Sequence, residues 1–250
     1  MKLLAIIGLL GIMQGQPAFE VASVKPANAG NGFSGGCHGI DSVYAPNKAA
    51  SAPPLGRCVI RDARLDHLLF IANHVRSMAQ ISGGPDWIRD DRFNNDAKAE
   101  DPTKATEKQL LQMLQALLTE RFSLKMRVEM KDMPGYALIV AKNGPKLHEA
   151  KGQDVSFHFG PNGKPGRGPN MLSARAHSML MLANILTMFG DPVIDKTGLT
   201  GSYDLTLSWD ETDGPTLSTA LQEQLGLKFE SQKVPVPFYV IESARKPTEN

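Results

Sequence analysis

Residues 106–141 read TEKQLLQMLQALLTERFSLKMRVEMKDMPGYALIVA, and this stretch decides the fold. Thr106 and Gln109 have the spacing of a capping box, in which the two side chains satisfy free amides at a helix start. The apolar residues that follow recur at helical spacing, which predicts a helix with one buried face. From Ser123 to Met130 the apolar residues alternate, which predicts a strand with one buried and one wet face.

A turn and a return strand are expected next. Lys131 to Gly135 contains a proline and a glycine, which are typical of turns. Tyr136 to Ala141 is mostly apolar and predicts a strand that pairs back on the first one. The stretch therefore predicts one helix followed by a β-hairpin.

A second stretch, residues 216–241, repeats this order near the end of the chain. Leu-Lys-Phe at 227–229 corresponds to Leu-Lys-Met at 124–126, and Val234-Pro235 corresponds to Met133-Pro134. Any two helix–hairpins look alike to some degree, but the shared order of helix, alternating strand, proline turn and apolar strand favours a true repeat. The predicted fold class is α+β, with two related helix–β-hairpin modules, each a small sheet with helices packed on one face.

Size and charge narrow the classes of function. A chain of 250 residues is long enough to bury one sizeable core or two small ones. The formal net charge is +1 and no long basic run occurs, so the electrostatic footprint of a nucleic-acid-binding protein is missing. We therefore expect no nucleic-acid partner.

The first residues have the composition of a signal peptide. Lys2 precedes an uncharged run from Leu3 to Met13, which is too short to span a bilayer. Cleavage is expected near Gly15 or Ala18, and no cysteine follows the run that could carry a lipid. The alternative is a buried N-terminal helix. The pattern favours an exported protein, periplasmic or extracellular, without a transmembrane segment in the mature chain.

The chain has two cysteines, Cys37 and Cys58, and they flank a loop rich in small residues and proline. In an exported protein these cysteines are expected to form a disulfide, because oxidising compartments preserve such bonds. The alternative is a metal pair assisted by His38. That site needs further ligands, and the spacing is not that of a zinc site.

The turn-rich stretches divide the chain into five expected segments. These are a signal peptide at 1–18, an N-terminal strand and disulfide-pinned loop at 19–61, a first α+β module at 62–150, a Gly/Pro-rich linker at 151–171, and a second α+β module at 172–250.

Five motifs together resemble a family known only as soil-associated proteins of unknown function. The motifs are FEVASVKP at 19–26, ISGGPDW at 81–87, VAKNGPKL at 140–147, VIDKTGLTGSY at 193–203 and KPTEN at 246–250. The resemblance covers nearly the whole mature chain and implies an exported protein, without any established activity. Some relatives look fused to a membrane metallopeptidase of the antibiotic-sensor type, which implies a sensing role outside the cytoplasm.

A second resemblance concerns only the order of elements. Residues 179–241 are similar in this respect to the short N-terminal domain of secretins and TonB-dependent receptors. Those domains bind protein partners, so the likeness implies a protein or polymer partner in the cell envelope by analogy alone.

One motif suggests covalent chemistry. Asp195-Lys-Thr-Gly198 matches the phosphorylated aspartate of P-type ATPases, but the membrane bundle and nucleotide domain that this chemistry needs are missing from the sequence. We interpret Asp195 as a residue whose carboxylate bonds the backbone of a turn. The Gly-Lys in the stretch from Gly160 to Gly168 lacks the spacing of a phosphate-binding loop.

Metal and acid–base sites are weakly indicated. His67 and His74 could share one helix face, but no neighbouring carboxylate completes a metal site. Four acidic residues gather around Trp87, without the spacing of a calcium loop: Asp86, Asp90, Asp91 and Asp96. The sequence therefore assigns no catalytic, metal-binding or cofactor-binding residue, and we expect no cofactor.

Trp87 and Trp209 are the residues that we select as possible binding residues. Both follow a glycine-containing turn, one in each half, and core packing is the ordinary role for such a side chain. If they are exposed, they are the first candidates for contact with a glycan, a peptide or a partner.

The function that these observations favour is an exported, non-catalytic binding or sensing module of the bacterial cell envelope, with an unknown ligand. Recognition through an open strand edge is expected, with 123–130 or 203–209 as the strand. Two alternatives stay open: a secreted hydrolase whose site is assembled from residues distant in sequence, and a purely structural envelope protein.

Overall fold

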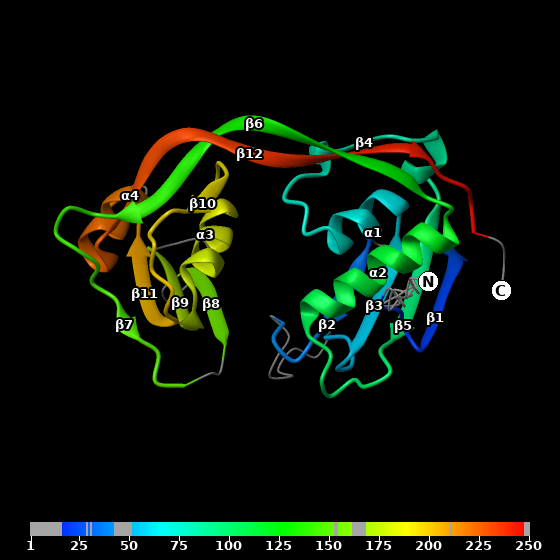
Figure 1. Cartoon of the computed structure of the whole chain (residues 1–250), viewed down its shortest axis with the longest axis horizontal. Coiled ribbons are helices and arrows are strands. Elements are labelled where there is room, and N and C mark those ends of the chain that lie inside the picture. The colour runs from blue at the N-terminus through cyan, green and yellow to red at the C-terminus, as the bar shows by residue number, and fades with distance from the viewer. Residues whose placement is uncertain are drawn as a thin grey trace, which may run out of the picture.

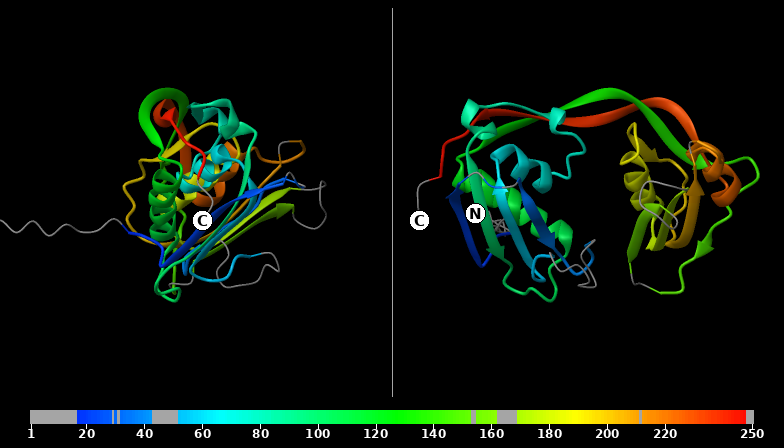
Figure 2. Two further views of the ribbon diagram at one scale, coloured as in Figure 1. Left: turned by 90° about the vertical axis from the view of Figure 1, so that its right-hand side faces the viewer. Right: turned by 180° about the vertical axis from the view of Figure 1, so that it is seen from behind.

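The computed structural model describes residues 17–28, 30, 32–42, 52–152, 155–161, 169–210 and 212–247. Two lobes hang below one long two-stranded ribbon, so that the molecule has the shape of an arch (Figure 1). Views from the side and from behind show the ribbon passing over both lobes (Figure 2). Helices and strands both occur in each lobe, which confirms the α+β class. The expected signal peptide at 1–18 lies outside the described residues, except for its last two positions.

The first lobe consists of a four-stranded sheet with two helices packed on it. The sheet has the order β1-β5-β3-β2. Its elements are β1 (Val21–Ala27), β2 (Ser34–His38), β3 (Arg57–Ala63), α1 (Leu65–Ala72), η1 (Met78–Gln80), η2 (Asp86–Arg89), β5 (Arg92–Lys98) and α2 (Glu107–Arg121). The capping box of Thr106 and Gln109 is present, and the predicted apolar face of α2 is buried through Leu110, Leu114 and Leu118.

The second lobe repeats this arrangement. Its sheet has the order β7-β11-β9-β8. These four strands occupy the same places as β1, β5, β3 and β2 in the sheet of the first lobe. The elements are β7 (His148–Glu149), β8 (Ser156–Pro161), β9 (Asn170–His177), α3 (Met179–Thr187), β11 (Tyr203–Trp209), α4 (Leu217–Ala220) and η3 (Leu221–Leu225). Within the stretch expected to be a linker, Ser156–Pro161 pairs with β9, and residues 162–168 lie outside the described part.

The ribbon is formed by β6 (Lys125–Val140) and β12 (Leu227–Ser243). They pair antiparallel along their whole length, from Leu227 beside Val140 to Ser243 beside Lys125. Two short strands extend the ribbon at its ends. β4 (Ile81–Gly83) runs parallel to β12, and β10 (Val193–Asp195) runs parallel to β6.

The predicted turn at Lys131 to Gly135 is wrong, because these residues continue the strand β6. The N–H of Tyr136 donates to the carbonyl of Pro192, on the side of β6 away from β12. The backbone N–H groups of residues two apart in a strand point to the same side, so the nitrogen of Pro134 also faces away from β12. The N–H that Pro134 lacks is therefore not needed in the ladder, and proline is tolerated there.

The apolar alternation in the first half of β6 is also misleading about burial. Val128 and Met130 are 55% and 60% exposed, although the pattern predicts that they point into a core. At the ends of the ribbon, Met126 packs against the first core and Leu138 lies in the second. In the middle, Val234 and Val236 of β12 are buried while Val128 and Met130 of β6 stay exposed, so the apolar side chains of the two strands differ in burial.

Candidate functional site

A cavity of about 410 Å³ lies where the two lobes approach each other. In Figure 1, α3 of the second lobe faces α1 and α2 of the first lobe beneath the ribbon. The first lobe supplies most of the lining and the second lobe supplies Met181. From the first lobe come Asp41, Ala72, Asn73, His74, Glu107, Lys108, Leu111, Gln112 and Gln115.

Among the residues that line the cavity, Glu107 has the most strongly shifted pKa. It is the first residue of α2, and its backbone N–H donates to Asp41 Oδ1 at 2.7 Å. Desolvation by burial and the neighbouring Asp41 carboxylate raise the pKa of Glu107 to about 7. Sequence reasoning missed both residues. The capping box marked this end of the helix, but the sequence does not show that Asp41 reaches it.

His74 also lines the cavity and lies just after α1. Its φ of 47° is left-handed, which is uncommon for a residue with a side chain. Burial lowers the pKa of His74, while no carboxylate contributes to the shift. Since α1 ends at Ala72, His74 does not share a helix face with His67.

Two amides fix the wall between the helices. The Nε2 of Gln115 donates to the carbonyl of Ala72 at 2.8 Å and to Asn73 Oδ1 at 3.3 Å. These bonds tie the middle of α2 to the end of α1. Near the cavity the lobes also meet directly, because Arg76 donates through Nη2 to Asn184 Oδ1 at 2.8 Å. The cavity thus has one firmly bonded wall and one wall that belongs to the other lobe.

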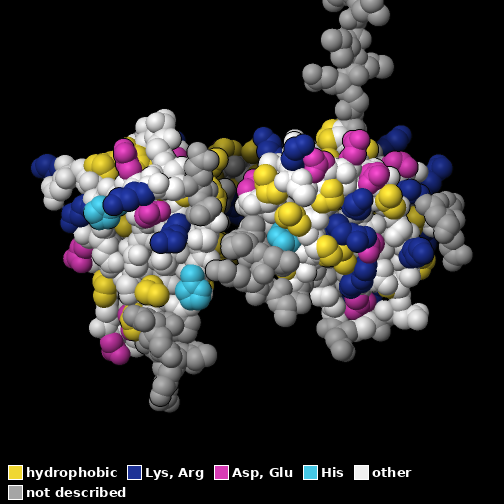
Figure 3. Space-filling model, turned by 90° about the horizontal axis from the view of Figure 1, so that it is seen from below, with side chains coloured by type: hydrophobic (Ala, Val, Ile, Leu, Met, Phe, Trp, Pro, Cys, Tyr) yellow, Lys and Arg dark blue, Asp and Glu magenta, His cyan; other side chains and the backbone are white. Residues whose placement is uncertain are grey.

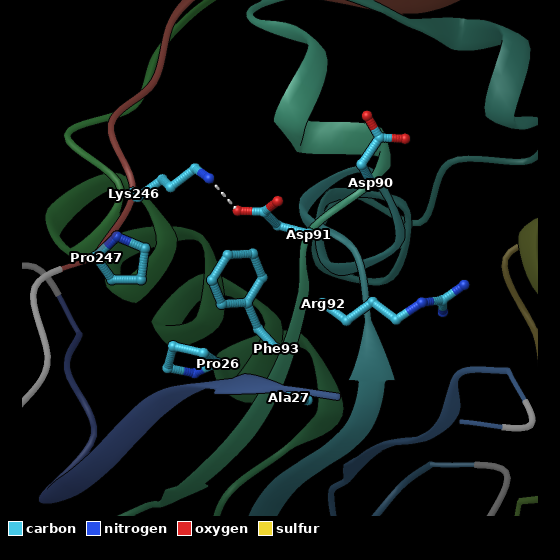
Figure 4. Close-up of a pocket in the computed structure, with 8 residues that line it drawn as sticks. All are labelled: Pro26, Ala27, Asp90, Asp91, Arg92, Phe93, Lys246 and Pro247. Atoms are coloured by element: carbon cyan, nitrogen blue, oxygen red, sulfur yellow. Dashed lines mark ion pairs between the residues drawn. The ribbon is translucent and has the colours of Figure 1, made fainter. Parts of the chain in front are cut away.

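A second cavity, of about 350 Å³, lies at the far end of the first lobe. The residues around it come from the end of β1, the start of β5 and the last described residues of the chain (Figure 4). Lys246 Nζ forms an ion pair with Asp91 at 2.6 Å and lies 5.9 Å from the ring centre of Trp87. Three motifs of the sequence thus meet here: those ending at Pro26 and Trp87 and the one that begins at Lys246.

The two tryptophans occupy core positions. Trp209 is only 3% exposed, and its ring packs against Phe159 and Phe189. Trp87 is partly buried, with its ring stacked at 6.1 Å on Phe122. Their arrangement matches the ordinary role that the sequence indicated, and a binding role for either residue stays a prediction.

The other singled-out residues do not assemble into one site. Asp91 and Asp96 have different partners, because Asp96 bonds Arg57 at 2.6 Å and Arg61 at 3.2 Å. In the described part of the chain, no three residues of the metal-binding types come together. Asp195 Oδ1 accepts from the N–H of Thr197 at 2.9 Å, which confirms the interpretation of a turn residue.

The predicted disulfide between Cys37 and Cys58 is confirmed. It joins β2 to β3, and both cysteines are buried beneath α2. Asp41 lies three residues beyond His38 on the same segment, so the bond holds in place the stretch that leads to the cavity.

Charge is distributed evenly on the face that Figure 3 shows. Basic and acidic side chains both occur on the two lobes there (Figure 3). Across the described residues, no helix is long and apolar enough to cross a membrane.

Comparison with known proteins assigns the chain to a family but not to a function. Neither the curated proteins nor the solved structures include a match to this chain. One family profile matches residues 66–244, which is most of the chain and includes α1 from its second residue, α2, both helices of the second lobe and the whole ribbon. The chain therefore belongs to the family described as "Protein of unknown function (DUF3738)".

Proposed function

We propose that this protein is an exported, non-catalytic binding or sensing module of the bacterial cell envelope, and that its ligand binds in the cavity between the lobes. The observation that carries the proposal is that this cavity takes its lining from both lobes. Ligand sites are common at such boundaries, since a ligand there makes contacts that neither half offers alone.

The chemistry of the lining defines the class of ligand. Asp41 and Glu107 are acceptors when ionised, and Gln112 offers an amide. Leu111 and Met181 add apolar surface. A compact polar ligand with amine or hydroxyl donors fits this set. A ligand that touches both lobes also adjusts the distance between them, which is how binding would become a signal.

Export is supported by the buried disulfide, because such bonds persist in oxidising compartments. The likeness to secretin and TonB-receptor domains, the soil association and the five-segment organisation remain part of this hypothesis. The rival hydrolase needs an acid–base pair. The cavity holds His74 and two carboxylates, but among the contacts of the described residues no hydrogen bond or ion pair joins His74 to either carboxylate. A binding role is therefore the better account.

A photo-crosslinking amino acid at Gln112 tests the proposal in the cells that make the protein. Gln112 lines the cavity, whereas Glu120 is an exposed residue of the same helix outside it and serves as the control position. We expect one recurrent adduct from position 112 that is missing at position 120. Identical adducts at both positions, or none at either, would refute a ligand site between the lobes.

A further inference from the structure

Among the described residues, the outer edge of β6 lacks a partner strand over most of its length. On one side β6 pairs with β12 throughout, whereas on the other its one partner within the described ranges is β10, at Tyr136, Ala137 and Leu138. In the described part of the chain, no strand pairs with residues 125–135 on that outer side. The middle of this edge carries the exposed apolar side chains of Val128 and Met130.

The hydrogen-bonding direction of this edge follows from its contacts with the segment around β10. The N–H of Tyr136 donates to Pro192, and the carbonyl of Leu138 accepts from the N–H of Lys196 at 2.9 Å. The backbone N–H and C=O groups of the even-numbered residues of β6 thus point away from β12. The register with β12 has no shift before Ile241, so the same direction holds for Met126, Val128, Met130 and Asp132. These residues offer N–H and C=O groups to another strand.

The outer edge of β12 is less able to accept a strand. The carbonyl of Pro237 accepts from Gln80 Nε2 at 2.8 Å, on the side away from β6. Pro235 and Pro237 therefore both occupy outward positions, where proline has no N–H to offer. Prolines at such positions protect an edge against pairing. On β6 only Pro134 has this effect, and it follows Asp132, the last residue of the open stretch that offers an N–H on this edge.

We propose that β6 is the interface with a second copy of this chain, paired antiparallel edge to edge with Met130 on the twofold axis. In this arrangement Glu129 lies opposite the partner's Lys131, and Lys131 lies opposite the partner's Glu129. A twofold interface of this kind is self-complementary, because each contact occurs twice. The result is a continuous four-stranded sheet built from the two ribbons.

Charge selects this register over its neighbours. An axis through Glu129 would place Arg127 opposite the partner's Lys131. An axis through Val128 would place Lys125 opposite the partner's Lys131. An axis through Lys131 would place two lysines opposite each other. Like charges directly opposite on neighbouring strands destabilise a sheet, while opposite charges stabilise it. Of these four registers, only the axis through Met130 pairs opposite charges without opposing like ones.

A charge exchange tests the interface in the full chain with its disulfide intact. Glu129→Lys and Lys131→Glu each place like charges opposite each other twice, so each should weaken dimerisation roughly tenfold or more in sedimentation equilibrium. The double variant restores both opposite-charge pairs and should restore the dimer.

The control for this exchange is Arg127→Ala. Within its own chain Glu129 forms ion pairs with Arg127 at 2.6 Å and with Lys131 at 3.7 Å, and Arg127 lies opposite the partner's Met133 in the proposed register. This variant removes the shorter of the two ion pairs and should leave the dimer unchanged. A monomeric parent protein, or a double variant that stays as weak as the single ones, would overturn the proposal.

Cysteine crosslinking tests the register itself. A residue on the axis faces its own counterpart at a Cα separation of about 5.5 Å, which a disulfide can bridge. Met130→Cys should therefore form a covalent dimer under mild oxidation. Val128→Cys is the matched control, because its counterpart lies about 13 Å away along the strand. Crosslinking through position 128 instead of 130 would overturn the register, and crosslinking at neither position would overturn the interface.

Discussion

Ser123 and Gly226 occupy the same position in the two halves of the chain. Each is a left-handed residue, with φ of 44° and 65°, between the last helical segment of a lobe and the long strand that leaves it. Ser123 precedes Leu124, and Gly226 precedes Leu227, with both leucines buried. The turn at this position sends the strand out of the lobe and into the ribbon. The two halves therefore use different residues, a serine and a glycine, at the same left-handed turn.

Ser123→Gly is expected to stabilise the protein. A left-handed φ strains any residue with a Cβ, whereas glycine adopts it freely. The side chain of Ser123 is exposed, so its removal costs little packing. We expect a gain of about 0.5–1 kcal/mol in the free energy of unfolding, measured by urea denaturation. Unchanged or lower stability would show that the strain at Ser123 is compensated locally.

Gly226→Ala is expected to do the reverse, for two reasons. The added methyl group would be strained by the left-handed φ, and it would also collide with the carbonyl oxygen of Gly144. Gly144→Ala is the matched control, because Gly144 has a φ of 80° and no heavy atom within 4 Å of an added Cβ. The control should lose about 1 kcal/mol and Gly226→Ala clearly more. Equal losses would mean that the backbone moves to relieve the collision.

Removal of the disulfide should destabilise the first lobe. The bond closes a loop with a sequence separation of 21 residues, for which loop-closure entropy predicts about 3 kcal/mol. The double variant Cys37→Ser, Cys58→Ser should lose about this amount in chemical denaturation. Dithiothreitol should lower the stability of the parent protein and leave that of the variant unchanged. A variant as stable as the parent would contradict the loop-closure argument.

The local parts of the fold could be predicted from the sequence. The capping box at Thr106, the buried face of α2 and the pairing of Cys37 with Cys58 all depend on nearby residues or on a single pair. The turn at Met133-Pro134-Gly135 failed because the same residues also fit an extended strand once proline faces away from the ladder. Which strand pairs with which is decided by contacts about a hundred residues apart, and a single sequence does not display them.

The residues of the candidate site could not be predicted from the sequence, for a related reason. Asp41 lies in the disulfide loop and Glu107 lies at a helix start, 66 residues later, so neither position signals the other. Met181 reaches the cavity only because the second lobe faces the first. The sequence marked instead the conspicuous residues, such as Trp209, which the structure buries in the core.

The stability of the protein should fall as pH rises from about 4.5 to about 7, because of Glu107. Its pKa is raised from 4.5 to about 7 in the folded protein by burial and by Asp41. At low pH the carboxyl group is protonated in both the folded and the unfolded state and has no effect. As pH rises above the unfolded pKa, the unfolded state loses its proton first, so the folded state becomes relatively less stable until Glu107 is ionised in both.

Glu107→Gln removes this dependence, since an amide does not ionise. The variant should therefore gain stability over the parent at about pH 8 and show a much smaller difference at about pH 5, as measured by urea denaturation. Asp41→Asn separates the two causes: it keeps an oxygen that caps α2 but removes the charge, so it should shift the transition of Glu107 to lower pH. Glu120→Gln on the exposed side of α2 is the control and should change nothing at either pH. If Glu107→Gln gave the same gain at both pH values, the cause would be the packing of the new side chain, and the raised pKa of Glu107 would be contradicted.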